Sequence, residues 1–68
     1  MLYTIEIDSS EPLNELERKK SLIHFYMDKK NKVYSYRLVF SNRDDLINFQ
    51  HSIKDDKRII SVRGDMQS

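Results

Sequence analysis

The chain has 68 residues, no cysteine, one glycine and one proline, and a formal net charge of +1 at pH 7. This length allows one domain with a modest core, and without cysteine the chain forms neither disulfides nor thiolate metal sites. No apolar run approaches the roughly 20 residues that span a membrane, and the first residues lack the features of a signal peptide. We therefore expect one cytoplasmic domain over residues 1–64 and a frayed tail over residues 65–68.

Charge is unevenly distributed along the chain. Residues 1–17 contain only acidic charges, whereas residues 18–43 are strongly basic, with Asp28 as their one acid. Such asymmetry can mark a nucleic-acid surface.

The first predicted elements are a strand and a short helix. Residues 2–8 alternate between apolar and polar side chains, which predicts a half-buried strand. Two serines before Pro12 predict a helix start, so we expect a helix over residues 12–20 with Leu13 and Leu16 facing the core. Acids early and bases late in this helix complement its dipole, which accounts for much of the charge asymmetry.

Two aromatic, β-prone runs follow and predict a hairpin. Ser21–Met27 and Lys32–Phe40 are joined by a loop over residues 28–31, with Asn31 in the left-handed conformation that asparagine tolerates. This register pairs Phe25 with Tyr34. It places nearly all apolar side chains on one face, namely Ile23, Phe25, Met27, Tyr34, Tyr36, Leu38 and Phe40.

One alternative concerns residues 12–27, which could form a single helix with Leu13, Leu16, Ile23 and Met27 on one face. That stripe would bury Lys19 or Lys20, and residues 22–27 are rich in strand formers. The sequence therefore favours a helix followed by a strand.

The second helix has the clearest start signal in the chain. Ser41 and Asn42 precede two aspartates, and Leu46, Phe49 and Ile53 follow at helical spacing. A polar turn ends the helix, and residues 58–63 form the last strand, with Ile60 and Val62 inward and Ile59 outward.

The resulting order is β-α-β-β-α-β. This order is the ferredoxin-like α+β arrangement, in which an antiparallel four-stranded sheet carries both helices on one face.

No motif indicates a catalytic, metal or cofactor site. His24 and His51 lie on different predicted elements without convergent ligands. The paired aspartates at 44–45 and 55–56 fit a helix cap and a polar turn, and the single glycine excludes a glycine-rich phosphate loop. We expect no enzyme, no cofactor and no membrane association.

Nucleic-acid binding is the alternative function. Residues 32–39 have a superficial likeness to the central-strand motif of RNA-recognition domains, in which exposed aromatics stack on bases. Val33 replaces the glycine of that motif, and the predicted register buries Tyr34 and Tyr36. An RNA- or single-stranded-DNA-binding regulator would then rely on the basic hairpin.

Protein binding is the favoured function. The face opposite the helices is predicted to mix apolar and charged groups, namely Leu2, Thr4, Glu6, Leu22, His24, Tyr26, Val33, Arg37, Val39, Ile59, Ser61 and Arg63. Apolar groups rimmed by charge are typical of interfaces. The simpler interpretation is that Glu6, Arg37 and Arg63 neutralise one another across the strands.

We expect a small regulatory or inhibitory protein that docks on a larger protein partner through its open sheet face and its basic hairpin tip. The small size, together with an amino-acid usage that often reflects AT-rich coding sequences, suggests a modulator of host machinery encoded by a phage or mobile element. A homodimer would also help so small a core. The expected contact residues are His24, Tyr26, Lys29, Lys30, Lys32, Val33 and Arg37.

Overall fold

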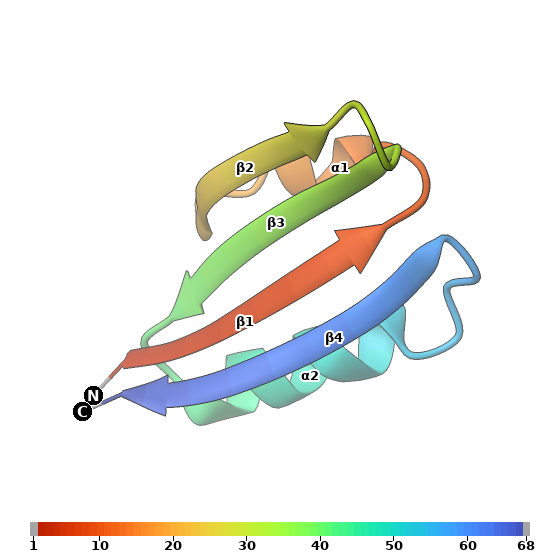
Figure 1. Ribbon diagram of the computed structural model, residues 1–68. Helices are drawn as coiled ribbons and strands as arrows, with labels where there is room; N and C mark the ends of the chain where they lie inside the picture. Colours follow the sequence, from red (N-terminus) through yellow and green to blue (C-terminus); the bar gives the residue numbers. More distant parts are fainter. Residues whose placement is uncertain (1, 68) are drawn as a thin grey trace.

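The computed structural model describes residues 2–67, and of residues 65–67 only the backbone. The elements are β1 (Leu2–Ser9), α1 (Asn14–Glu17), β2 (Leu22–Asp28), β3 (Val33–Phe40), α2 (Arg43–Ile53) and β4 (Ile59–Gln67). The strands form one antiparallel sheet in the order β2-β3-β1-β4, and both helices lie behind it in Figure 1. The predicted ferredoxin-like α+β fold is confirmed.

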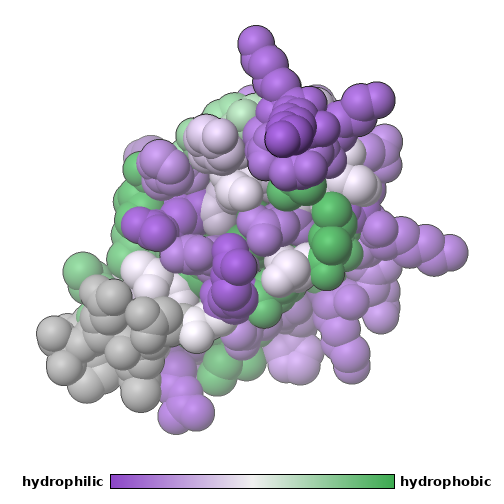
Figure 2. Space-filling view, in the orientation of Figure 1, coloured by the Kyte–Doolittle hydropathy of each residue, from purple (hydrophilic) through white to green (hydrophobic). Residues whose placement is uncertain are grey.

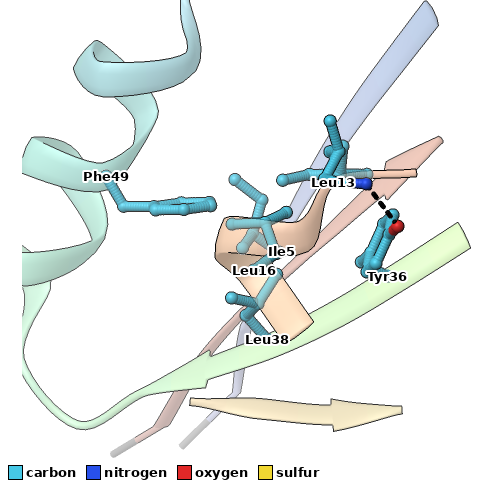
Figure 3. Close-up of a cluster of buried hydrophobic side chains, with 7 residues drawn as sticks. Ile5, Leu13, Leu16, Tyr36, Leu38 and Phe49 are labelled. Atoms are coloured by element: carbon cyan, nitrogen blue, oxygen red, sulfur yellow. Dashed lines mark hydrogen bonds between the residues drawn. The ribbon is translucent and has the colours of Figure 1, made fainter. Parts of the chain in front are cut away.

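The core lies between the central strands and the helices. β1 and β3 each supply two alternate side chains, and α1 with its preceding residue and α2 supply the others (Figure 3). Its members are Ile5, Ile7, Leu13, Leu16, Tyr36, Leu38 and Phe49, each at most 6% exposed. The sequence predicted all of them on the helix side of the sheet.

The first helix is shorter than predicted. α1 has four residues instead of spanning residues 12–20, and no side chain caps it. The serines expected to cap it have other partners, because Ser9 donates to the Glu11 carbonyl and Ser10 to the Arg58 carbonyl. The chain then turns directly into β2, which excludes the single helix over residues 12–27.

A buried hydrogen bond joins the start of α1 to the sheet. The Leu13 N–H donates to the phenolic oxygen of Tyr36 over 2.7 Å (Figure 3). Both side chains are 1% exposed, so water cannot replace this acceptor. Burial raises the pKa of the Tyr36 phenol, and the Leu13 N–H opposes that shift.

Tyr36→Phe should lower the free energy of unfolding by about 1–3 kcal/mol, because it leaves the buried Leu13 N–H without an acceptor. Urea denaturation measures this change. Tyr26→Phe is the matched control, since Tyr26 is 57% exposed and should change stability by less than about 0.5 kcal/mol. Equal effects of the two variants would contradict the role of this hydrogen bond.

The hairpin register differs from the prediction by two residues. Phe25 pairs with Tyr36 rather than with Tyr34, and the loop covers residues 29–32. The residue with positive φ is Lys32 (φ 56°), not Asn31. The cause lies in the turn, where the Asp28 carboxylate accepts the N–H groups of the two residues that follow Lys29. A two-residue shift preserves the faces, so the apolar side of the hairpin is as predicted.

Two bulges change which side chains turn inward. The pairing of β2 with β3 shifts between Leu22 and His24. The pairing of β4 with β1 shifts opposite the junction of Asp8 and Ser9. Each bulge inserts one extra residue and reverses the alternation beyond it. Leu22 and Ile59, predicted to face outward, therefore pack against the core. Ile23 and Ile60, predicted to face inward, are 55% and 61% exposed.

The second helix agrees with the prediction. The Asn42 side chain accepts the Asp44 N–H over 2.7 Å, and Leu46 and Ile53 pack against the core beside Phe49. At 11 residues α2 is the longer helix, and no helix of the described part of the chain is long and apolar enough to cross a membrane.

The last strand is longer than predicted. β4 continues through residues 65–67, where its backbone pairs with β1 up to Leu2 opposite Gln67. The sequence predicts a frayed tail for these three residues, whereas their backbone is paired with β1. Ser68 lies outside the described residues.

Candidate functional site

The sheet face turned away from the helices carries a network of opposite charges. Glu6, on a central strand, accepts from Arg37 over 2.8 Å and from Arg63 over 3.2 Å, and these arginines flank it on β3 and β4. Asp8 lies 3.4 Å from Arg63 and accepts the Ser35 hydroxyl over 2.7 Å. The charges at the centre of this face therefore compensate one another, as the simpler interpretation of the sequence holds.

A shallow depression of about 240 Å³ lies over this network. Its lining is Glu6, Asp8, His24, Tyr26, Ser35, Tyr36, Arg37 and Arg63. Tyr26 stands at its border with 57% of its surface exposed. Figure 2 shows this side of the molecule, where hydrophilic side chains cover most of the surface and smaller apolar patches lie between them.

The predicted contact residues separate into two groups. His24, Tyr26 and Arg37 lie together around the depression on the open face. Lys29 and Lys32 instead border a different depression of about 310 Å³.

That second depression belongs to the helix side of the hairpin. Its other lining residues include Met27 and Tyr34, a cross-strand pair on the same side as the core residue Tyr36. The hairpin tip thus lies between the two faces rather than within the open one. Lys30 is exposed in the turn, and Val33 is half-buried opposite Asp28.

Asp8 and Ser35 also line the open-face depression, although neither was among the expected contact residues. They pair directly across β1 and β3, and their side chains are hydrogen-bonded. The alternation along the two strands predicts both on this face, Asp8 beside Glu6 and Ser35 beside Arg37.

The described side chains offer no arrangement for metal binding. Among residues 2–64, no three histidine, cysteine, aspartate or glutamate side chains converge as metal ligands. Glu6 and Asp8 are held by arginines instead. What this face presents is a tyrosine, an imidazole and a compensated set of charges, which are groups that can contact another molecule's surface.

A second charge cluster holds α1 to the loop before β4. The Arg58 guanidinium contacts Glu15 over 2.5 Å and Asp56 over 2.7 Å. Hydrogen bonds from the Arg58 side chain and backbone lower the pKa of Asp56 from 3.8 to about 2. The pKa of Glu15 is lowered by its backbone hydrogen bond and by Arg58, and the pKa of Arg58 is raised by both acids.

The lowered pKa of Asp56 predicts acid sensitivity. Its carboxylate is more acidic in the folded chain than in the unfolded chain, so its stabilisation is complete above about pH 4 and is lost as the pH falls toward 2. The melting temperature of the wild type should therefore fall more steeply over this interval than that of Asp56→Asn. Parallel slopes for the two proteins in thermal denaturation would contradict the assignment.

Comparisons with known proteins identify the fold but no family. No family model and no curated protein matches the sequence. Among solved structures, the chain is similar to a NIPSNAP family protein from Agrobacterium tumefaciens strain C58, with a TM-score of 0.54 and 10% identity over 100% of this chain and 92% of that one. At this identity the likeness shows the fold alone.

Proposed function

We propose that this chain is a non-enzymatic regulatory or inhibitory protein of the cytoplasm that docks on a larger protein through its open sheet face. The observation that carries the proposal is Tyr26, a large aromatic side chain that is 57% exposed beside a depression on a helix-free face. Tyrosine and arginine are the residues most enriched among strong interface contacts, and here Tyr26 and Arg37 border the same depression. A phage or mobile-element origin would fit this role.

The charge pattern indicates the chemistry of the partner. On the open face, Arg37 and Arg63 are already paired with acids. At the hairpin tip, Lys29, Lys30 and Lys32 are exposed, and no acid with a described side chain pairs with them.

The adjacent acid is already engaged. Hydrogen bonds from Asn31, first its side chain and then its backbone, lower the pKa of Asp28, which is committed to the turn. With three lysines against the single carboxylate of Asp28, the net charge of the hairpin tip is positive. A partner that complements this chain would therefore offer an apolar pocket for Tyr26 and an acidic patch for the hairpin tip.

Affinity capture from lysate of the native host, after nuclease treatment, tests the proposal. The wild type should retain one stoichiometric protein, and Tyr26→Ala should lose it. Ile60→Ala is the matched control, because Ile60 is 61% exposed, on β4 at the opposite edge of the sheet, and should retain the partner.

Two outcomes would overturn the proposal. One is equal capture by Tyr26→Ala and the wild type. The other is loss of every partner with nuclease together with recovery of nucleic acid in its absence. The second outcome would assign the hairpin lysines to nucleic-acid binding, with affinity that falls steeply as salt is added.

A further inference from the structure

The outer edge of β2 is unusually apolar for an unpaired strand. In the sheet order β2-β3-β1-β4, β2 has a neighbour on one side only. Its residues 22–27 contain no lysine, arginine, acid or proline, which are the residues that ordinarily protect strand edges. The other edge strand, β4, carries Arg63 and a glycine.

The same strand concentrates exposed apolar side chains. Of the seven exposed large hydrophobic residues with described side chains, four lie on β2, namely Ile23, Phe25, Tyr26 and Met27, at 37–57% exposure. They occur on both faces, because Tyr26 lies on the open face and Phe25 contacts Tyr36 on the helix side, with ring centroids 5.0 Å apart. The four-residue α1 is too short to cover this part of the sheet.

The regular part of β2 is self-complementary. After the bulge at Ile23, the strand runs regularly from His24 to Asp28, with Tyr26 at its midpoint. An antiparallel copy paired about that midpoint places Tyr26 beside Tyr26, Phe25 beside Met27, and His24 beside Asp28. Each pair is favourable: two aromatic rings, a ring with a thioether, and an imidazole beside the negative charge of Asp28, whose carboxylate keeps its hydrogen bonds within the turn.

We propose that two copies of this chain associate through the free edges of their β2 strands. The strands pair antiparallel about Tyr26 and join two four-stranded sheets into one sheet of eight. About half of the backbone N–H and C=O groups of an edge strand point away from its neighbour, and this pairing satisfies them. An interface made by one strand edge is small, so the dimer is weak and reversible.

This dimer would extend the proposed docking surface without depending on it. The two Tyr26 side chains would lie next to each other on one continuous open face. Dimerisation is measured on the purified protein alone, so its failure would leave the docking proposal intact, and a failed capture experiment would not affect the dimer.

Sedimentation equilibrium over a range of protein concentrations tests the association. The wild type should change reversibly from monomer to dimer as concentration rises. Met27→Lys keeps a side chain of similar length, puts a charge beside Phe25 of the second copy, and should weaken dimerisation more than about tenfold. Val62→Lys is the matched control on β4, where the native side chain is 45% exposed, and should dimerise as the wild type does.

Charge reversal at His24 tests the register with little risk to folding, because this side chain is exposed. In His24→Asp, the new carboxylate would lie beside Asp28 of the second copy and repel it, at two symmetric places in each dimer. In His24→Lys, the ammonium group would attract Asp28 at the same places. The lysine variant should dimerise about tenfold more tightly than the aspartate variant. A wild type that stays monomeric at all concentrations, or a dimer indifferent to both His24 and Met27 substitutions, would overturn the proposal.

Discussion

Phe49→Ala should lower the free energy of unfolding by about 3–5 kcal/mol, the largest effect expected for a single side chain here. Phe49 is 6% exposed, packs with its ring centroid 5.4 Å from that of Phe40, and is the one buried side chain of α2. A domain of this length has a total stability of roughly 3–10 kcal/mol, so the variant should be substantially unfolded at 25 °C.

Urea denaturation followed by circular dichroism measures this loss. Gln50→Ala, at the next position of the same helix, is the control, because Gln50 is exposed and its replacement should change stability by less than about 0.5 kcal/mol. A fully folded Phe49→Ala protein with wild-type stability would show that α2 does not seal the core.

Leu16→Ala should lower the free energy of unfolding by about 2–5 kcal/mol, although Leu16 lies in a helix of only four residues. So short a helix has no stability of its own. It persists because Leu13 and Leu16, 1% and 2% exposed, are buried against the sheet. Truncating Leu16 therefore opens a cavity and releases the segment that covers the centre of the sheet.

Thermal denaturation of Leu16→Ala and of the control Asn14→Ala measures this contribution. Asn14 is exposed in the same helix, and alanine favours helix there, so the control should melt at or slightly above the wild-type temperature. A loss below about 1 kcal/mol for Leu16→Ala would contradict its place in the core.

The fold was predictable because its elements carry strong periodic patterns. Alternation in β1 and the Leu46, Phe49 and Ile53 stripe of α2 are signals of burial on one side, and the structure confirms both. Those patterns predicted the topology and the core.

The details that sequence could not predict depend on contacts between distant residues. The start of α1 is one example, because the Leu13 N–H donates to the Tyr36 hydroxyl 23 positions away and the Ser10 hydroxyl donates to the Arg58 carbonyl 48 positions away. The hairpin register was misplaced by two residues, an error to which hydrophobic alternation is insensitive because its period is two.

The two bulges had the greatest consequence for the surface. They moved Leu22 and Ile59 inward and left Ile23 and Ile60 exposed. No local composition marks a bulge of this kind, since adjacent apolar residues can exchange places. Four of the seven exposed large hydrophobic residues with described side chains consequently lie along the edge strand β2.

Among the expected contact residues, three that share one strand face lie close together. His24, Tyr26 and Arg37 come together because the cross-strand pairs of β2 and β3 bring alternate residues to the same side. The hairpin lysines lie apart from this group, since the strand pattern ends at Asp28 and gives no direction for side chains in the turn.

Docking through the open sheet face is tested by the dissociation constant of the purified partner protein for the wild type, Tyr26→Ala and Ile60→Ala. We expect Tyr26→Ala to weaken binding by about 30-fold or more, as for a side chain that anchors an interface, and Ile60→Ala to bind as the wild type does. Equal dissociation constants for Tyr26→Ala and the wild type, with both proteins folded, would contradict a docking surface on the open face of the sheet.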